Sequence, residues 1–253
     1  MKNALLLVYM ILFGFMNFAY AKEEIEIFNR ANKLYMDQKY EEASREYEKL
    51  ISNQKVSAEV YFNLGNSYYK TGNIAGAILN YERAKRLRPS DPDIAYNLRL
   101  ANLNTIDKIE PVPQLFYERW WDDFVNNGSV TKRAIWALLL FWGALILGIV
   151  YLFSKVVVIR KITFFLTLLV TLSALFTLYL TFQQHQHLND NRAAIIFEES
   201  AYAKSSPDEK SSNLFLLHAG TRIEVLDELQ GWRKIRIANG NEGWVVSDAI
   251  EII

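Results

Sequence analysis

The sequence predicts a multi-domain membrane protein that combines all-α helical repeats, two transmembrane helices and a small all-β barrel. Three observations predict it. Two long apolar stretches, residues 134–154 and 162–182, lie in the second half of the chain. A period of 34 residues runs through the segment before them. Short alternating strands separated by glycine turns fill the segment after them.

The composition limits the function before any motif is considered. The 253 residues are 51% hydrophobic and 22% charged, with 28 basic and 28 acidic side chains and no cysteine. Without cysteine, a disulfide scaffold, a thiol redox enzyme and a cysteine-ligated metal site are excluded. A net charge of zero argues against a general nucleic-acid binder, which needs a basic surface. Three histidines supply few zinc ligands, so we expect neither a metal nor another cofactor.

The first 21 residues have the pattern of a secretory signal peptide. Lys2 supplies a positive start, residues 4–16 form a short apolar run, and residues 19–21 read Ala-Tyr-Ala, as at a cleavage site. We expect cleavage after Ala21, because the apolar run is short for a full membrane span. The alternative is an uncleaved anchor helix.

The two apolar stretches predict transmembrane helices over 134–154 and 162–182. Neither carries a charge, and each is long enough to cross a hydrocarbon core about 30 Å thick. A buried helix of a soluble domain is the alternative, but neither stretch has a polar face. Small residues recur at helical spacing and predict close packing of the two helices: Ala144, Gly148, Thr163, Thr167, Thr171 and Ala174. Because neither span contains an acidic or basic residue, the hairpin is interpreted as an anchor.

The loop between the spans predicts the orientation. Residues 155–161 carry three basic side chains, and short basic loops stay on the cytoplasmic side. The signal peptide independently exports the segment that follows it. Both indicate a two-pass protein of the bacterial cytoplasmic membrane, with residues 22–133 and the C-terminal part on the periplasmic side. Lys132 and Arg133 are a weak contrary signal.

Residues 24–57 and 58–91 align as two repeats. Among the matched pairs are Ala31 with Gly65 and Tyr47 with Tyr81. This period and pattern resemble the tetratricopeptide repeat, a helix–turn–helix unit. We therefore expect a repeat domain over 22–110, in which residues 92–106 form a capping helix.

The tetratricopeptide resemblance implies a binding groove lined by the first helix of each repeat. By family position the groove residues are Phe28, Asn32, Tyr35, Phe62, Asn63, Asn66 and Tyr69. Asn32 and Asn63 coincide with two asparagines of the carboxylate clamp of some family members, but the clamp's basic positions carry Phe28, Asp93 and Asn97. Capture of a C-terminal carboxylate is therefore not expected. The alternative is that some groove residues only pack on the cap or on a neighbour.

A basic run lies near the end of the second repeat: Arg83, Lys85, Arg86 and Arg88. We interpret it as a solvated helix face whose charges favour a helix C-terminus. The alternative is a contact with an acidic partner or with lipid head groups.

Residues 111–133 form an aromatic juxtamembrane segment. Five aromatic side chains recur there at helical spacing: Phe116, Tyr117, Trp120, Trp121 and Phe124. Tryptophan and tyrosine favour the membrane–water boundary, so an interfacial helix is expected. A partner-binding groove is the alternative.

From residue 193 the sequence predicts short strands, with turns at Gly220, Gly231 and Asn239-Gly240. The order of motifs in 193–253 resembles a bacterial SH3-like domain, a small barrel, through residues 219–225 and two Gly-Trp pairs. Such domains often bind cell-wall peptides or protein segments. The candidate contacts are Tyr202, Trp232 and Trp244. Core packing is the alternative for both tryptophans, and we favour it for Trp244.

The whole order of parts resembles the BatE family of the Bacteroides aerotolerance (Bat) operon. This resemblance implies a membrane scaffold linked to aerotolerance or oxidative stress. Its implied partners are membrane proteins with von Willebrand factor A domains and, indirectly, a MoxR-type ATPase. No catalytic residues are implied.

The sequence therefore predicts a non-enzymatic envelope adaptor that binds protein partners and membrane lipid and no nucleic acid. The alternative is a peptidoglycan-binding sensor. An enzyme is not expected, because the chain has no G-x-S-x-G, phosphate loop or H-E-x-x-H motif.

Overall fold

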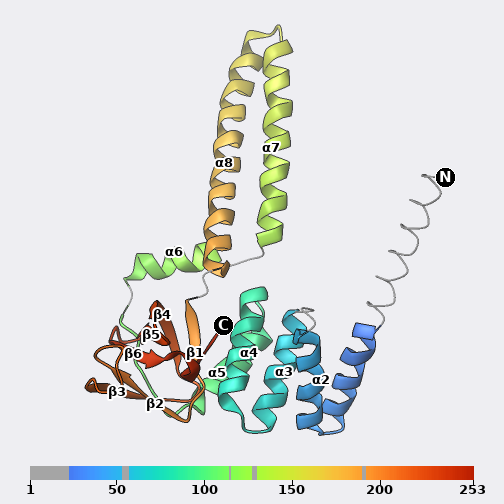
Figure 1. Cartoon of the computed structure of the whole chain (residues 1–253). Helices are drawn as coiled ribbons and strands as arrows, with labels where there is room; N and C mark the ends of the chain where they lie inside the picture. The colour runs from blue at the N-terminus through green and yellow to red at the C-terminus, as the bar shows by residue number, and fades with distance from the viewer. Residues whose placement is uncertain (1–22, 53–56, 114, 127–129, 190–191) are drawn as a thin grey trace, which may run out of the picture. The chain divides into compact units, whose positions relative to one another are not determined.

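The computed structural model describes residues 23–52, 57–113, 115–126, 130–189 and 192–253 (Figure 1). The expected signal peptide, residues 1–21, lies outside the described residues. The chain divides into two compact units. One joins the helical repeats to the C-terminal strands, although the sequence separates them, and the other contains α6 and the two long helices.

The repeat domain is a row of antiparallel helices in which each helix packs against the next. A helix over residues 23–36 is followed by α2 (Tyr40–Ser52), α3 (Ala58–Lys70), α4 (Ile74–Leu87) and α5 (Pro92–Leu103). Ser57 and Asp91 cap the N-termini of α3 and α5 by accepting backbone N–H groups. The expected helical repeats are therefore confirmed.

A close helix crossing explains the small residue at the centre of the second repeat. A Cβ added to Gly65 would lie 2.7 Å from the ring of Tyr81 on α4, so only glycine fits. Tyr81 and its repeat equivalent Tyr47 are both 1% exposed. The ring of Tyr81 fills the space beside the crossing at Gly65.

The basic run on α4 is only partly a solvated face. Arg83 donates to Glu251 Oε1 at 3.1 Å and to the carbonyl of Ile252 at 2.6 Å. Arg86 donates to the carbonyl of Ile253 at 2.6 Å. The interpretation as a solvated face is wrong for these two arginines, because they contact residues 251–253, in and just after the last strand.

The second unit contains α6 (Phe116–Asn126), α7 (Val130–Phe153) and α8 (Val157–Asn189). Two stretches, Thr131–Phe153 and Val157–Gln183, are long and apolar enough to cross a membrane. Helix α8 begins at Val157, so Arg160 and Lys161 lie in its first turns and not in the connecting loop. No proline or glycine between Ser154 and Ile162 stops the helix from starting early.

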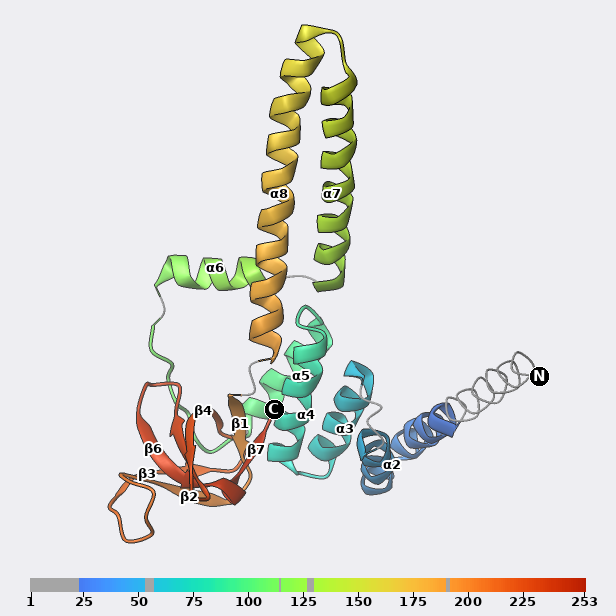
Figure 2. The same cartoon turned by 45° about the horizontal axis from the view of Figure 1, so that its top comes forward.

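Helices α7 and α8 pack side by side along their length (Figure 2). Thr163 and Ala174 of α8 are buried, as the small-residue pattern predicted. Gly148 has open space beside it and makes no close helix contact.

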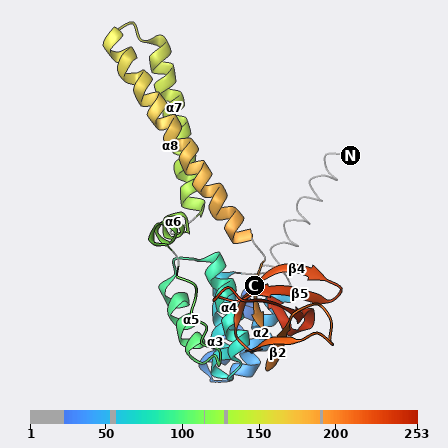
Figure 3. The ribbon, with the colours of Figure 1, turned by 90° about the vertical axis from the view of Figure 1, so that its left-hand side faces the viewer.

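Figure 3 shows α6 end-on while the long helices run lengthwise, so α6 lies across their direction. Arg133 of α7 donates to the carbonyls of Phe124 and Val125 at the end of α6.

The C-terminal β-domain (192–253) is a seven-stranded antiparallel sheet with the order β3-β2-β6-β5-β4-β1-β7. Its strands are β1 (Ala193–Ile196), β2 (Ser200–Lys204), β3 (Asn213–His218), β4 (Arg222–Leu229), β5 (Trp232–Arg236), β6 (Glu242–Val246) and β7 (Ile250–Ile252). Gln230 and Gly231 both have positive φ, as the tight turn between β4 and β5 requires.

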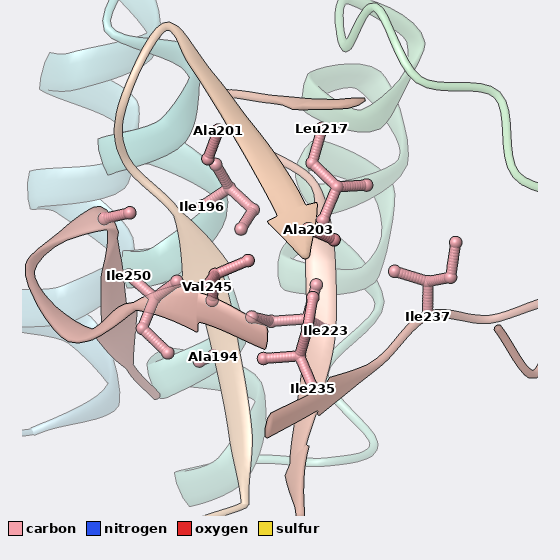
Figure 4. Packing of buried hydrophobic residues seen from close by; sticks show 11 residues of the cluster. Ala194, Ile196, Ala201, Ala203, Leu217, Ile223, Ile235, Ile237, Val245 and Ile250 are labelled. Atoms are coloured by element: carbon pink, nitrogen blue, oxygen red, sulfur yellow. The ribbon is translucent and has the colours of Figure 1, made fainter. Parts of the chain in front are cut away.

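The sheet closes around one apolar core (Figure 4). Side chains from strands far apart in the sheet order meet there, among them Ala194 of β1, Leu217 of β3 and Ile250 of β7. This small β-domain, the helical repeats and the two apolar helices confirm the fold class that the sequence predicted.

Candidate functional site

Asn32 and Asn66 occupy equivalent positions in successive repeats and anchor two equivalent hydrogen-bond groups. Asn32 Oδ1 accepts from the hydroxyl of Tyr47 at 2.6 Å and from Asn63 Nδ2 at 3.2 Å. Asn66 Oδ1 accepts from the hydroxyl of Tyr81 at 2.8 Å and from Asn97 Nδ2 at 2.8 Å. Each group therefore joins the two helices of one repeat to the first helix of the next unit.

The same amides keep unused hydrogen-bonding capacity. Within the described residues, Asn32 and Asn66 have no bonded partner for Nδ2, and Asn63 and Asn97 have none for Oδ1. Amide donors and acceptors can pair with the backbone of a bound peptide, which offers both kinds of group. The structural and binding roles of these residues are thus compatible.

An aromatic row runs beside the asparagines. Phe28 and Phe62 are half-buried and pack edge-on or tilted against Tyr47 and Tyr81, at ring-centroid distances of 6.1 and 5.9 Å. Tyr96 follows at the same spacing on α5 and is 54% exposed. The row gives apolar area with little side-chain entropy to lose on binding.

A second row contains the other two predicted residues. Tyr35 packs edge-on against Tyr40 with ring centroids 5.1 Å apart, and burial raises its pKa. The hydroxyl of Tyr69 accepts from Asn104 Nδ2 at 3.2 Å. Leu103 occupies the equivalent position on α5 and is 73% exposed.

We call the half-buried and exposed residues of these rows the first-helix face. It contains all seven predicted residues, namely Phe28, Asn32, Tyr35, Phe62, Asn63, Asn66 and Tyr69, and continues onto α5 through Tyr96, Asn97, Leu100 and Leu103. Sequence reasoning missed Tyr96, Leu100 and Leu103 because α5 was interpreted only as a cap. Extending the 34-residue period from Phe62, Asn66 and Tyr69 would have found them.

The three candidate residues of the β-domain share one outer face of three neighbouring strands. Tyr202 of β2 is 53% exposed between the buried Ala201 and Ala203. Trp244 of β6 is half-buried and lies between the buried Gly243 and Val245. The alternation of strand side chains therefore directs Tyr202 and Trp244 away from the core.

Trp232 of β5 belongs to the same face. It is half-buried and three residues before the buried Ile235, so it has the opposite orientation. Neither Trp232 nor Trp244 is a member of the buried core, so the interpretation of Trp244 as core is wrong. A Cβ added to Gly243 would lie 2.9 Å from Ala203 Cβ, which explains the glycine before this tryptophan.

Basic side chains flank the aromatic ones, and we call the whole set the outer sheet face: Tyr202, Lys204, Trp232, Lys234, Arg236, Glu242 and Trp244. In the strand register Trp244 lies opposite Lys204 on one side and Lys234 on the other. Lys234 and Arg236 pair with Glu242 at 2.7 and 2.6 Å, and their hydrogen bonds lower the pKa of Glu242. The aromatic rings can stack on flat groups of a ligand. The basic side chains beside them can attract acidic groups of the same ligand.

Comparisons with known protein families support two of the three parts. The TPR repeat model matches residues 31–72 and 65–104, and the bacterial SH3 domain model matches residues 199–251. No curated protein matches the chain. Both kinds of domain are typically non-catalytic and suggest protein–protein interaction, and the bacterial SH3 domain also suggests peptidoglycan binding. The described residues contain no cluster of acidic, histidine or cysteine side chains that could hold a metal ion.

Proposed function

We propose that this protein is a non-enzymatic, membrane-anchored adaptor of the bacterial cell envelope. Its first-helix face binds a segment of a protein partner, and its β-domain binds a second one. The first-helix face carries this proposal, because aromatic rings, half-buried on the repeats and exposed at Tyr96, recur at the same spacing beside amides with spare hydrogen-bonding capacity. The TPR repeat match over the same helices supports it.

The proposed location is the cytoplasmic membrane, with both modules on the periplasmic side. Two helices can cross a membrane, and a two-span hairpin returns the chain to the side from which it came. Buried contacts between the repeats and the β-domain require this return, because the two modules must meet in one compartment. Lys155, Arg160 and Lys161 at the hairpin tip favour a cytoplasmic tip.

The partners proposed from the Bat resemblance are envelope proteins with von Willebrand factor A domains and, through them, a MoxR-type ATPase. The order of repeats, hairpin and β-domain supports this assignment. The proposed role is assembly of these proteins in aerotolerance or oxidative stress. Because the chain has no cysteine, it has no thiol with which to sense oxidants itself.

Site-specific photo-crosslinking in growing cells tests the adaptor function. A photoreactive amino acid at Tyr69 or Tyr96 on the first-helix face should give a discrete crosslinked species. The same group at Lys49, which is exposed on α2, is the matched control. Mass spectrometry should identify an envelope protein in the species crosslinked from Tyr69 or Tyr96, and none in that from Lys49. Equal products from all three positions would reject the first-helix face as the binding site.

A peptidoglycan sensor is the second candidate, favoured by the outer sheet face and by the bacterial SH3 domain match. The full chain in detergent should then pellet with purified cell-wall sacculi. Trp232→Ala should reduce pelleting several-fold, while Lys210→Ala in the exposed loop after β2 should not. Absence of wild-type pelleting would remove this candidate.

A further inference from the structure

A short segment joins the end of the repeat domain to the β-domain. We call residues 105–112 the strap. A Cβ added to Gly220 of the β-domain would lie 3.1 Å from Thr105 Cγ2, so the β-domain and the start of the strap lie in close contact. Ile109 packs against the β-domain core, and the backbone N–H of Val112 donates to the carbonyl of Ala238 at 3.0 Å. The strap therefore contacts the β-domain at its start, at Ile109 and at its end.

Asp107 lies in the middle of the strap, and its side chain is only 12% exposed. Its carboxylate accepts three hydrogen bonds from the turn between β3 and β4. The donors are the backbone N–H of His218 at 2.7 Å, His218 Nδ1 at 2.7 Å and the hydroxyl of Thr221 at 2.5 Å. Hydrogen bonds to a charged, sheltered acceptor are stronger than neutral ones and fix the geometry of both partners.

A second attachment is apolar and comes from β1. Ala194 and Ile196 point into the β-domain core, whereas Ile195 between them is fully buried in the core of the repeat domain. There it joins Ile78 of α4 and Ala101 of α5. One strand thus contributes to two cores, and this removes apolar surface from water on both faces.

A third attachment is polar and lies along α4. Arg83 donates to the carbonyl of Ile252 in β7, and Arg86 donates to that of Ile253, the residue after this strand. Glu82, one residue before Arg83, lies 3.5 Å from Arg222 of β4. Figures 1 and 2 agree in placing β1 near α4, and Figure 2 also shows β7 on this side of the β-domain.

We infer that the repeat domain and the β-domain form one rigid binding platform, and that Asp107 is the positioning residue that fixes the angle between them. Attachments of different kinds at the strap, at β1 and along α4 prevent rotation about any one of them. Two modules on a flexible linker would bind their ligands independently. A rigid platform instead holds the first-helix face and the outer sheet face in a constant relation, whatever their ligands are.

Distance measurements between two spin labels test this inference on the full chain. Because the protein has no cysteine, the pair Lys85→Cys and Asp227→Cys gives one labelled position on exposed surface of each domain. The labelled protein in nanodiscs should show a single narrow distance distribution. A broad distribution for this otherwise native chain would overturn the rigid platform.

Adding Asp107→Ala to the labelled pair tests the positioning role. The distribution should widen at least two-fold while the helix and strand content by circular dichroism stays unchanged. Glu110→Ala, an exposed acid of the same strap, is the matched control and should leave the distribution narrow. If Asp107→Ala fails to fold, Asp107→Asn is used, since it keeps one acceptor oxygen at the same size. An unchanged narrow distribution in the folded variant would overturn the role of Asp107.

Discussion

Asn66 combines the two roles that the first-helix face requires. Its amide oxygen satisfies the hydroxyl of the buried Tyr81 and ties α3 to α5 through Asn97, while its amide nitrogen remains available. Asn32 does the same with Tyr47 one repeat earlier, and burial raises the pKa of Tyr47 to about 12. These hydroxyls therefore stay protonated and act as donors throughout the physiological pH range.

Replacing Asn66 by leucine should destabilise the repeat domain through the hydroxyl that loses its partner. Leaving the buried Tyr81 hydroxyl unsatisfied costs about 1–3 kcal/mol. Tyr81→Phe, which removes the hydroxyl and leaves the Asn66–Asn97 bond in place, should cost less. Urea unfolding of the full chain in detergent measures both. An Asn66→Leu protein as stable as Tyr81→Phe would contradict the structural role of this amide.

The hydrogen bonds of Asp107 predict a pH dependence of stability. Burial works to raise the pKa of Asp107, but the bonds from Thr221 and His218 outweigh it and hold the pKa below the ordinary value of 3.8. The stabilisation is therefore fully present above that ordinary value and is lost as the pH falls through the lowered pKa. The melting temperature of the wild type should exceed that of Asp107→Asn by a constant amount between about pH 5 and 7, and the difference should shrink below about pH 4. A difference that persists unchanged in acid would contradict this assignment.

At the level of helices and strands, local patterns predicted most of the fold. The 34-residue period predicted the helical repeats, and alternation with glycine turns predicted the strands. The contact between the repeats and β1 could not be predicted, because no local pattern records which distant surface a strand will meet. One signal was present: Ala194, Ile195 and Ile196 are apolar in succession, as in a strand that is buried on both faces.

Helix α6, which we expect beside the membrane, allows a direct test of its environment. Phe116, Trp120 and Phe124 are exposed at helical spacing, and Trp120 stacks on Phe124 with ring centroids 5.8 Å apart. Such a face is typical of a helix in the boundary region of a membrane, and we expect α6 to lie there. A single Trp120→Cys carrying a polarity-sensitive dye should emit at shorter wavelength in liposomes and be quenched by spin-labelled lipid. The neighbouring Arg119→Cys, away from the aromatic row, should do neither. Equal emission from the two positions would favour the alternative of a protein-binding groove.

For the whole molecule, the buried contacts of Ile195 and Asp107 separate two questions about topology. In the proposed two-span arrangement, these contacts require the repeats and the β-domain to share one side of the membrane, whichever side it is. The positive loop and the signal-peptide pattern address only which side that is. The two arguments can therefore fail independently.

Labelling with a membrane-impermeant maleimide distinguishes them. Single cysteines at Lys85 and Asp227 should both react in intact spheroplasts, and one at Lys155 should react only after the membrane is opened. Reaction of the first two only after opening would reverse the orientation but leave the rigid platform intact, because both domains would still lie together. Opposite behaviour of Lys85→Cys and Asp227→Cys would refute the contact between the domains, since a strand cannot reach the core of the repeats across a bilayer about 30 Å thick.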